Sequence, residues 1–254
     1  MSLHPMLAVI PARLGSKGLA RKNILIFAGL PMIAHSIRFA SMCPEIDRCV
    51  VSTESEEVAE IARAHGGDVP FLRPAELAAD DSPTSPVVQH ALHQVEQQEG
   101  KTYGSVLLLQ PTSPARLPAD LTQALTILEA DANAAGVVAV AETSFNPRHV
   151  CVQQGTEALK MAFADPNGQE HYERRQTFPG VYRITGSLYL WQRNYVQQCG
   201  DINLSRDRHR LLLIPKERAI DIDDLYDFRM AELAVTSGIC PLPWLAAEQG
   251  AAKA

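Results

Sequence analysis

The sequence predicts an α/β domain with a mostly parallel sheet, because short apolar segments alternate with helical segments along most of the chain. The first apolar run, residues 6–10, ends at Pro11 and leads into a loop that contains glycines. Pro31 suits the first position of a helix, and apolar residues follow it at helical spacing as far as Ala40. The next apolar run, residues 48–52, completes a strand–helix–strand unit, which predicts parallel pairing with a right-handed crossover.

The same alternation continues through the rest of the core. Thr53 and Glu56 form a capping-box pattern that predicts the start of a helix, and Gly66-Gly67 predicts its end. The pattern further predicts strands at 69–72, 106–109, 137–141, 187–191 and 211–214, and helices at 86–99, 119–130 and 225–236.

Residues 143–183 break this pattern. Helical periodicity disappears there, and Asn146-Pro147 and residues 165–168 supply turn chemistry between short apolar runs. We interpret this stretch as a β-rich insertion, whose role is dimerisation, lid formation or that of a plain surface hairpin.

Composition limits the classes of protein that fit. The chain has 254 residues, with 29 acidic and 23 basic side chains and a formal charge of −6, which argues against a general nucleic-acid binder. Its five cysteines are scattered without a C-x-x-C pair, as expected of reduced thiols in a cytoplasmic protein. No apolar run is long enough to span a bilayer, and the start does not read as a signal peptide, so we expect no membrane partner.

Positive charge is concentrated in the loop after the first strand, IPARLGSKGLARKN at residues 10–23. Arg13 and Lys17 stand beside Gly15 and Gly18, and the first acidic residue of the chain is Glu45. A loop at the carboxyl end of a strand in an open α/β sheet is a favoured ligand site, and glycines let backbone N–H groups approach an anion. The loop matches neither a P-loop nor the G-x-G-x-x-G pattern. It therefore predicts another kind of phosphate site, with a solvated basic turn as the alternative.

A pair of carboxylates lies far away in the sequence, in AIDIDD at residues 219–224. If this segment is extended, Asp221 and Asp223 leave the same face about 6 to 7 Å apart and can hold one hard cation, such as Mg²⁺, between them. The alternative is that Asp223 or Asp224 caps the helix that begins near Leu225.

Polar residues also follow two other predicted strands. Gln110, Thr112 and Ser113 come after the run that ends at 109, and Arg73 follows the run at 69–72. They are expected near the same cleft, although Thr and Ser often serve as turn formers and Arg as a surface charge. His90 and His93 lack the carboxylate or cysteine partners of a metal site.

Four motifs, in order, resemble the acylneuraminate cytidylyltransferases, the CMP-sialic acid synthetase family. They are the basic loop, RPAELAADD at 73–81, LLLQPTSPAR at 107–116 and AIDIDDLYDF at 219–228. The resemblance implies a Rossmann-like sheet of the nucleotide-diphospho-sugar transferase type and a homodimer in which the insertion of one subunit reaches the other subunit's site. It also implies the reaction of CTP with an acidic nine-carbon 2-keto sugar to give CMP-sugar and pyrophosphate, with Mg²⁺. The implied organisation is a nucleotide-binding core at 1–142, a dimerisation and substrate insertion at 143–183, the remainder of the core at 184–240 and a tail at 241–254.

The resemblance also assigns roles to individual residues. Catalysis falls to Arg13, Lys17, Asp221 and Asp223, of which the two aspartates form the metal pair. The implied nucleotide contacts are Arg13, Ser16, Lys17, Lys22, Asn23 and Arg73, and the implied sugar contacts are Gln110, Thr112, Ser113, Arg175 and Arg183, with Arg175 acting across the dimer and Arg148 as a weaker candidate.

One departure bears on the substrate. Thr185 stands where members of this family often have Asn, and a hydroxyl cannot make the paired contacts of an amide. This leaves sialic acid, a legionaminic-like or pseudaminic-like sugar, or a Kdo-type reaction open. The remaining alternatives are a relative that binds nucleotide without catalysis and a nucleotidyltransferase that uses another base or sugar.

Overall fold

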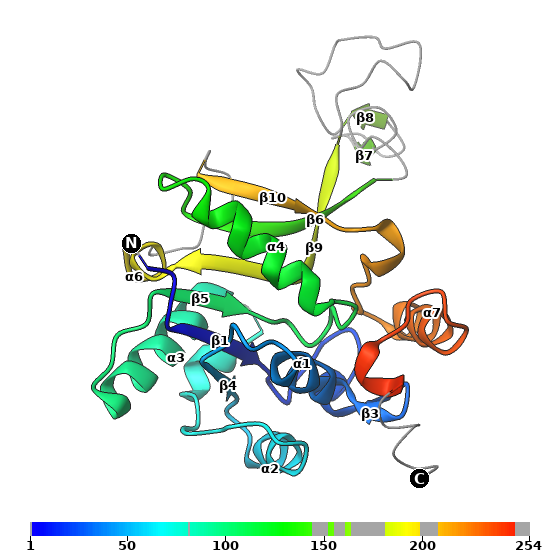
Figure 1. Cartoon of the computed structure of the whole chain (residues 1–254). Helices are drawn as coiled ribbons and strands as arrows, with labels where there is room; N and C mark the ends of the chain where they lie inside the picture. The colour runs from blue at the N-terminus through cyan, green and yellow to red at the C-terminus, as the bar shows by residue number, and fades with distance from the viewer. Residues whose placement is uncertain are drawn as a thin grey trace.

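The computed structural model of the chain describes residues 2–80, 82–143, 152–154, 161–163, 181–198 and 208–246. Its centre is a six-stranded sheet (Figure 1). In spatial order the strands are β10 (His209–Leu213), β6 (Gly136–Glu142), β9 (Tyr182–Gln192), β5 (Ser105–Leu108), β1 (Met6–Pro11) and β4 (Arg48–Ser52). Strand β9 runs antiparallel to both of its neighbours, and the other pairs in this sheet are parallel. The predicted α/β class with a mostly parallel sheet is confirmed.

Helices cover both faces of the sheet. Figure 1 shows α1 (Met32–Ser41) and α4 (Pro118–Glu129) in front of it, and α4 contacts β10, β6 and β9. On the opposite face, α3 (Thr84–Glu99) packs on β1 and β4, and α6 (Arg193–Gln198) packs on β5 and β9. The other helical elements in the described part of the chain are α2 (Glu56–Ala64), α7 (Leu225–Thr236) and the 3-10 turns η1 (Lys22–Ile24), η2 (Ala75–Ala78) and η4 (Lys216–Arg218).

The two faces of the sheet carry separate apolar cores. In β1, Ala8 and Ile10 join the core beneath α1 and α4, whereas Leu7 and Val9 join the core beneath α3 and α6. All four side chains are fully buried, as expected when alternate residues of a strand point to opposite faces of a sheet covered on both sides. A short hairpin of β2 (Ile26–Phe27) and β3 (Leu30–Pro31) follows the basic loop.

Two local predictions are wrong. The cap of α2 is Ser55 and not Thr53, because Ser55 Oγ accepts a hydrogen bond from Val58 N, while Thr53 is buried before the helix begins. Residues 69–72 do not form a strand. Pro70 removes a backbone donor from that segment, so only one isolated bridge, between Val50 and Asp68, links this part of the chain to β4.

Strand β9 is longer than the predicted strand at 187–191, and it begins inside the stretch interpreted as the insertion. Within that stretch the structure describes a two-stranded antiparallel sheet of β7 (Val152–Gln154) and β8 (Met161–Phe163). At the other end of the chain, Leu242 and Trp244 are buried in the core. Among the described residues, no helix combines the length and apolar character needed to cross a membrane.

Candidate active site

A cavity of about 260 Å³ opens at the carboxyl ends of the parallel strands, close to the size of small-ligand sites. Loops that follow β1 and β5, together with residues from 73–80 and 82–84, form its walls. The residues that line it are Pro11, Arg13, Gly15, Ser16, Lys22, Asn23, Arg73, Leu77, Ala79, Asp80, Ser82, Thr84, Val87, Gln110, Pro111 and Thr112. The cavity thus brings together all but one of the residues predicted to contact nucleotide, and it includes Gln110 and Thr112 from the sugar set.

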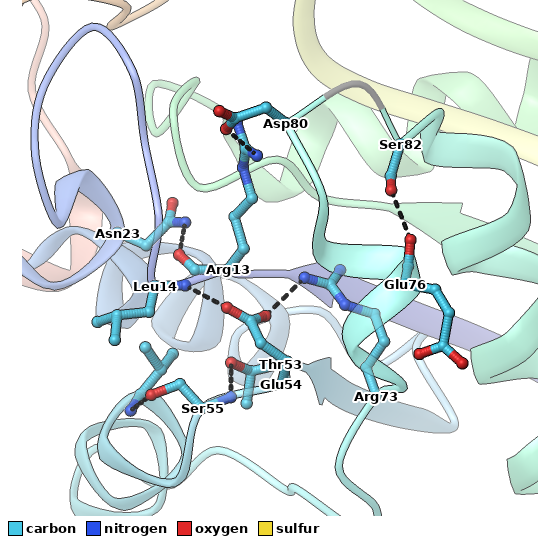
Figure 2. A network of polar contacts seen from close by, with 11 residues as sticks. Arg13, Leu14, Asn23, Thr53, Glu54, Ser55, Arg73, Glu76, Asp80 and Ser82 are labelled. Atoms are coloured by element: carbon cyan, nitrogen blue, oxygen red, sulfur yellow. Dashed lines mark hydrogen bonds and ion pairs between the residues drawn. The ribbon is translucent and has the colours of Figure 1, made fainter.

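The basic loop is held in place by side-chain contacts to its backbone. Asn23 Nδ2 donates to the carbonyl of Arg13 at 2.8 Å, and Leu14 N donates to Glu54 Oε1 at 2.8 Å (Figure 2). Asn23 is buried, so its amide shapes the loop as well as lining the cavity. The contact from Glu54 was not expected from the sequence.

Arg13 and Lys17 both face Asp80. Arg13 Nη1 lies 2.6 Å from Asp80 Oδ1, and Lys17 Nζ lies 3.5 Å from Asp80 Oδ2. The Lys17 side chain is 75% exposed and does not line the cavity. The two cations predicted to hold phosphates therefore share a carboxylate in this structure.

Arg73 is a buried cation in the cavity wall. Its guanidinium Nη2 donates to Glu54 Oε2 at 2.9 Å, and burial lowers the pKa of Arg73 below its ordinary value. Arg73 Nε is buried without a hydrogen-bond partner among the described residues. Its backbone N–H donates to the carbonyl of Thr53 at 2.7 Å, which ties this segment to the end of β4 although no strand forms.

The turn after β5 is clamped from below by Arg116, a residue that sequence analysis did not select although it lies in the quoted motif. Its Nη2 donates to the carbonyls of Gln110 and Ser113, each at 2.6 Å, and its Nη1 donates to Ser36 Oγ at 3.0 Å. The side chain is 1% exposed, and this burial lowers the pKa of Arg116 to about 9. A single buried guanidinium thus sets the shape of the turn that carries Gln110, Thr112 and Ser113.

The basic loop and the distant aspartates meet. Lys22 Nζ donates to the carbonyl of Ile222 at 2.6 Å and to Asp223 Oδ1 at 3.0 Å. Gly18 packs so tightly on this segment that a Cβ at its position would lie 2.3 Å from the Asp223 carbonyl oxygen. The two groups of charged residues therefore border a single site.

The aspartate segment also rests on the turn after β5. Ile222 N donates to the carbonyl of Thr112 at 2.9 Å, and Ser113 Oγ donates to Asp221 Oδ1 at 3.3 Å. Partial burial raises the pKa of Asp221 above its ordinary value, and the neighbouring charge of Asp223 raises it further. Neither aspartate lines the cavity itself; they flank it beside Lys22.

Asp224 has a different task. Its side chain accepts a hydrogen bond from Asp227 N at 2.9 Å and caps α7, and the Asp227 carboxylate accepts from Asp224 N in return. The alternative of a helix cap thus applies to Asp224, the residue next to the predicted metal pair.

Thr185 does not line the cavity. It is fully buried, and its hydroxyl contacts the Ala139 carbonyl at 3.1 Å and Ser187 Oγ at 2.8 Å inside the sheet. Gly186 is the residue that approaches the site: with φ of +73°, it lies where a Cβ would be 2.6 Å from Ser113 Oγ and 2.8 Å from Gln110 Oε1. The interpretation that Thr185 limits the sugar has no support in this geometry.

Of the three arginines predicted to lie near the sugar, the structure describes Arg183. Arg183 is exposed at the start of β9 and donates through Nη2 to the carbonyl of Ala219, two residues before Asp221. Arg148 and Arg175 lie outside the described residues.

A mostly parallel sheet, with a cationic loop after its first strand and carboxylates facing that loop, defines an α/β protein with a site suited to a phosphorylated ligand. Residues 7–232 match the family model described as cytidylyltransferase. The chain belongs to the cytidylyltransferase family and is a nucleotidyltransferase, which confirms the resemblance seen in its motifs.

The chain is also similar to individual proteins with assigned activities. The chain is 36% identical to a CMP-N,N'-diacetyllegionaminic acid synthase of Legionella pneumophila, over 89% of this chain and 94% of that protein. It is 31% identical to an N-acylneuraminate cytidylyltransferase of Escherichia coli O18:K1:H7, over 91% of this chain but 51% of that longer protein. Among solved structures, a CMP:2-keto-3-deoxy-manno-octonic acid synthetase complexed with CTP shares the fold with a TM-score of 0.69 and 19% identity, over 92% of this chain and 99% of that one.

Proposed function

We propose that the protein transfers CMP from CTP to an acidic 2-keto nonulosonic sugar and releases pyrophosphate. The observation that carries this proposal is the contact between Lys22 and Asp223, which joins a cationic phosphate loop to a carboxylate pair beside one cavity. The substrate class is supported by the legionaminic and acylneuraminic acid enzymes that resemble most of this chain. A legionaminic-type sugar is the first candidate, since that relative is the more similar of the two.

The reaction is a substitution at the α-phosphorus of CTP. The anomeric hydroxyl oxygen of the sugar forms the new P–O bond in line with the breaking bond to pyrophosphate, and the hydroxyl proton passes to a base that the described residues do not identify. In this proposal, Arg13, which lines the cavity, and Lys17, which faces Asp80 outside it, bind the phosphates and stabilise the charge that grows on pyrophosphate. Arg73 and Asn23, which line the cavity, are proposed to bind the nucleoside. Gln110 and Thr112 of the cavity wall, with Ser113 buried behind them, are proposed to face the sugar. Much of the rate enhancement then comes from positioning.

Asp221 and Asp223 are suited to hold Mg²⁺. Their oxygens are the hard ligands that this ion prefers, and one or two carboxylates suffice when phosphates and waters complete the shell. Their mutual repulsion, which contributes to the raised pKa of Asp221, would be relieved by a bound cation. The described residues include no cluster of three or more His, Cys, Asp or Glu side chains that could form an all-protein metal site. Bound Mg²⁺ would supply charge neutralisation at the phosphates.

A homodimer is also part of the proposal. On one stretch of the sheet, β10 and β9 leave Leu211, Leu213, Ile184 and Tyr182 between 41% and 54% exposed. Leu213 pairs with Val140, and Val140 pairs with Ile184, so Leu213 and Ile184 lie in one row across the sheet, on either side of the buried Val140 in β6. Contiguous exposed apolar residues often mark an interface, and a second copy of the chain would cover them. The action of Arg175 across the dimer stays a prediction. So do the location in the cytoplasm and the lack of nucleic-acid and membrane partners.

Pyrophosphate release tests the function directly. The purified protein should release pyrophosphate only when CTP, Mg²⁺ and an acidic keto-sugar are all present. The panel should include a legionaminic-type sugar, sialic acid, a pseudaminic-type sugar and Kdo, with UTP and ATP as nucleotide controls. Turnover with Kdo alone would favour the Kdo-type alternative, and CTP binding without turnover on any sugar would contradict the proposal.

A further inference from the structure

Glu54 connects two walls of the cavity without lining it. It lies two residues after the end of β4, and its side chain is 20% exposed. Oε1 accepts a hydrogen bond from Leu14 N at 2.8 Å, and Oε2 accepts one from Arg73 Nη2 at 2.9 Å. Figure 2 shows this carboxylate between the basic loop on one side and the Arg73 guanidinium on the other.

Arg73 depends on this partner. Its side chain is 3% exposed, and a guanidinium this deeply buried is costly unless a carboxylate compensates its charge. Arg13 is close enough to lower the pKa of Arg73 further, so like charge acts against its present position. Without Glu54, the Arg73 guanidinium would turn away from this position towards solvent.

The basic loop depends on the same carboxylate. Between Arg13 and Ser16 the backbone has no helical or strand pairing, so single side-chain contacts define its path. Asn23 holds the carbonyl of Arg13, and Glu54 holds the next N–H, that of Leu14. Loss of the second contact would let the segment carrying Arg13 and Ser16 move relative to the cavity.

We propose that Glu54 is a positioning residue for CTP. The Glu54 carboxylate fixes the phosphate loop and Arg73 at the separation that the nucleotide requires. This inference rests on the proposed function, because it takes CTP as the ligand. Glu54 acts through Leu14 and Arg73, so its loss weakens nucleotide binding more than it slows the chemical step.

The chain offers a closely matched control. Glu96 also holds one arginine and one backbone N–H: Oε1 accepts from Arg193 Nε at 2.7 Å and from Tyr103 N at 3.0 Å. The Glu96 side chain is 14% exposed, and neither Glu96 nor Arg193 lines the cavity. Each Gln variant therefore removes a carboxylate–guanidinium ion pair and leaves one amide oxygen to accept the backbone N–H. The pair at Glu96 has a second hydrogen bond, from Arg193 Nη2 to Oε2 at 2.9 Å, so its loss is at least as large a perturbation as the loss at Glu54.

The test measures Kd for CTP by calorimetry, KM for CTP and for the sugar, kcat, and Tm for each variant. Glu54→Gln should raise both Kd and KM for CTP about tenfold, as expected when a hydrogen-bonded charge loses its partner, with smaller changes in kcat and in KM for the sugar. Glu54→Ala, which loses the Leu14 contact as well, should bind CTP more weakly still. Glu96→Gln should lower Tm to a similar extent and leave Kd for CTP within about twofold of the wild type.

Two results would overturn the inference. One is a Glu54→Gln protein that binds CTP as tightly as the wild type; the other is a Glu96→Gln protein with the same loss of CTP affinity, which would indicate a general effect of destabilisation. If Glu54→Ala fails to fold, the near-isosteric Gln variant decides. A wild type that binds CTP but turns over no sugar would contradict the proposed function and leave the comparison of CTP affinities intact.

Discussion

Lys22 and Asp223 are 201 positions apart in the chain, and their side chains form an ion pair of 3.0 Å. Lys22 Nζ also donates to the carbonyl of Ile222, so one ammonium group fixes both the backbone and a carboxylate of the aspartate segment. The contact sets the distance between the phosphate loop and the proposed metal ligands.

Replacement of Lys22 by Met should separate these two parts of the site. The Lys22 side chain is 11% exposed, and Met fills a similar volume without a donor for Ile222 or Asp223. We expect kcat/KM to fall by about 100-fold, as when a group that stabilises developing charge is removed, together with a lower Tm. Lys216→Met, at an exposed position in η4, is the control and should retain activity. Unchanged kcat/KM in Lys22→Met would exclude this role.

The aspartate pair should be needed for turnover and not for nucleotide binding. Asp221→Asn and Asp223→Asn should each lower kcat by on the order of 100-fold or more, because the charge that holds Mg²⁺ is reduced, while CTP still binds to the basic loop. Asp224→Asn is the neighbouring control. Asn caps a helix as well as Asp does, so this variant should keep both its Tm and its activity. Equal losses at all three positions would contradict the assignment of the pair.

Asp80 should compete with the phosphates of CTP. It pairs with Arg13 and Lys17, the cations proposed to bind those phosphates, and a ligand must replace these contacts. Exposed pairs of this kind contribute ~0.2–1 kcal/mol, so Asp80→Asn should lower KM for CTP by roughly two- to fivefold. The control is Asp68→Asn, which removes an exposed partner of Arg48 outside the cavity. A higher KM in Asp80→Asn would show that Asp80 instead orients Arg13 for binding.

Gly186 should tolerate no side chain. Its φ of +73° disfavours other residues, and a Cβ would meet Ser113 Oγ at 2.6 Å and Gln110 Oε1 at 2.8 Å. Gly186→Ala should lose about 1–3 kcal/mol of stability and raise KM for the sugar, because both side chains must move. Gly100→Ala shares the backbone strain, with φ of +61°, but has open space around the Cβ, so it should lower Tm without changing KM. Equal KM values for the sugar in Gly186→Ala and Gly100→Ala would contradict the predicted movement of Ser113 and Gln110.

His35 should make the fold sensitive to acid. Burial lowers the pKa of His35 from 6.5 to about 4, and its Nδ1 accepts a hydrogen bond from Trp244 Nε1 at 3.0 Å, which only a neutral ring can do. The folded state therefore binds fewer protons than the unfolded state between these two values. The stability that neutral His35 provides is complete above about pH 6.5 and is lost as the pH falls from there towards about 4.

The measurement is Tm as a function of pH, compared by slope. His35→Asn keeps an oxygen acceptor for Trp244 and cannot be protonated, so its Tm should fall less steeply than that of the wild type between about pH 6.5 and 4. Parallel slopes for wild type and His35→Asn would contradict the prediction.

Most of the core could be predicted from sequence because its signals are local. Apolar runs, glycines and proline mark β1, α1 and β4, and α7 has the predicted bounds. The direction of β9 could not be predicted in this way, since a buried antiparallel strand carries the same apolar pattern as a parallel one.

Three side chains that shape the site could not be predicted, because their roles depend on contacts between distant parts of the chain. Glu54, Asp80 and Arg116 read as ordinary surface charges, because sequence alone does not show that distant segments bury or pair with them. Thr185 was overrated for the opposite reason: proximity to a motif does not show which side of a strand faces the ligand. The charged loop and the aspartates were found because several like charges in a short stretch are visible without coordinates.

Pairing of β6 with β9 continues to the rim of the site, where Glu142 lies opposite Tyr182 and Thr143 N donates to the carbonyl of Val181 at 3.2 Å. The residues on either side of the intervening segment, Thr143 and Val181, are therefore joined to each other. When the ends of a segment are already joined, each doubling of its length costs only about 0.6 kcal/mol in closure entropy. The number of residues between Thr143 and Val181 can thus change with little penalty for the sheet, because β6 and β9 already hold both ends of that segment together.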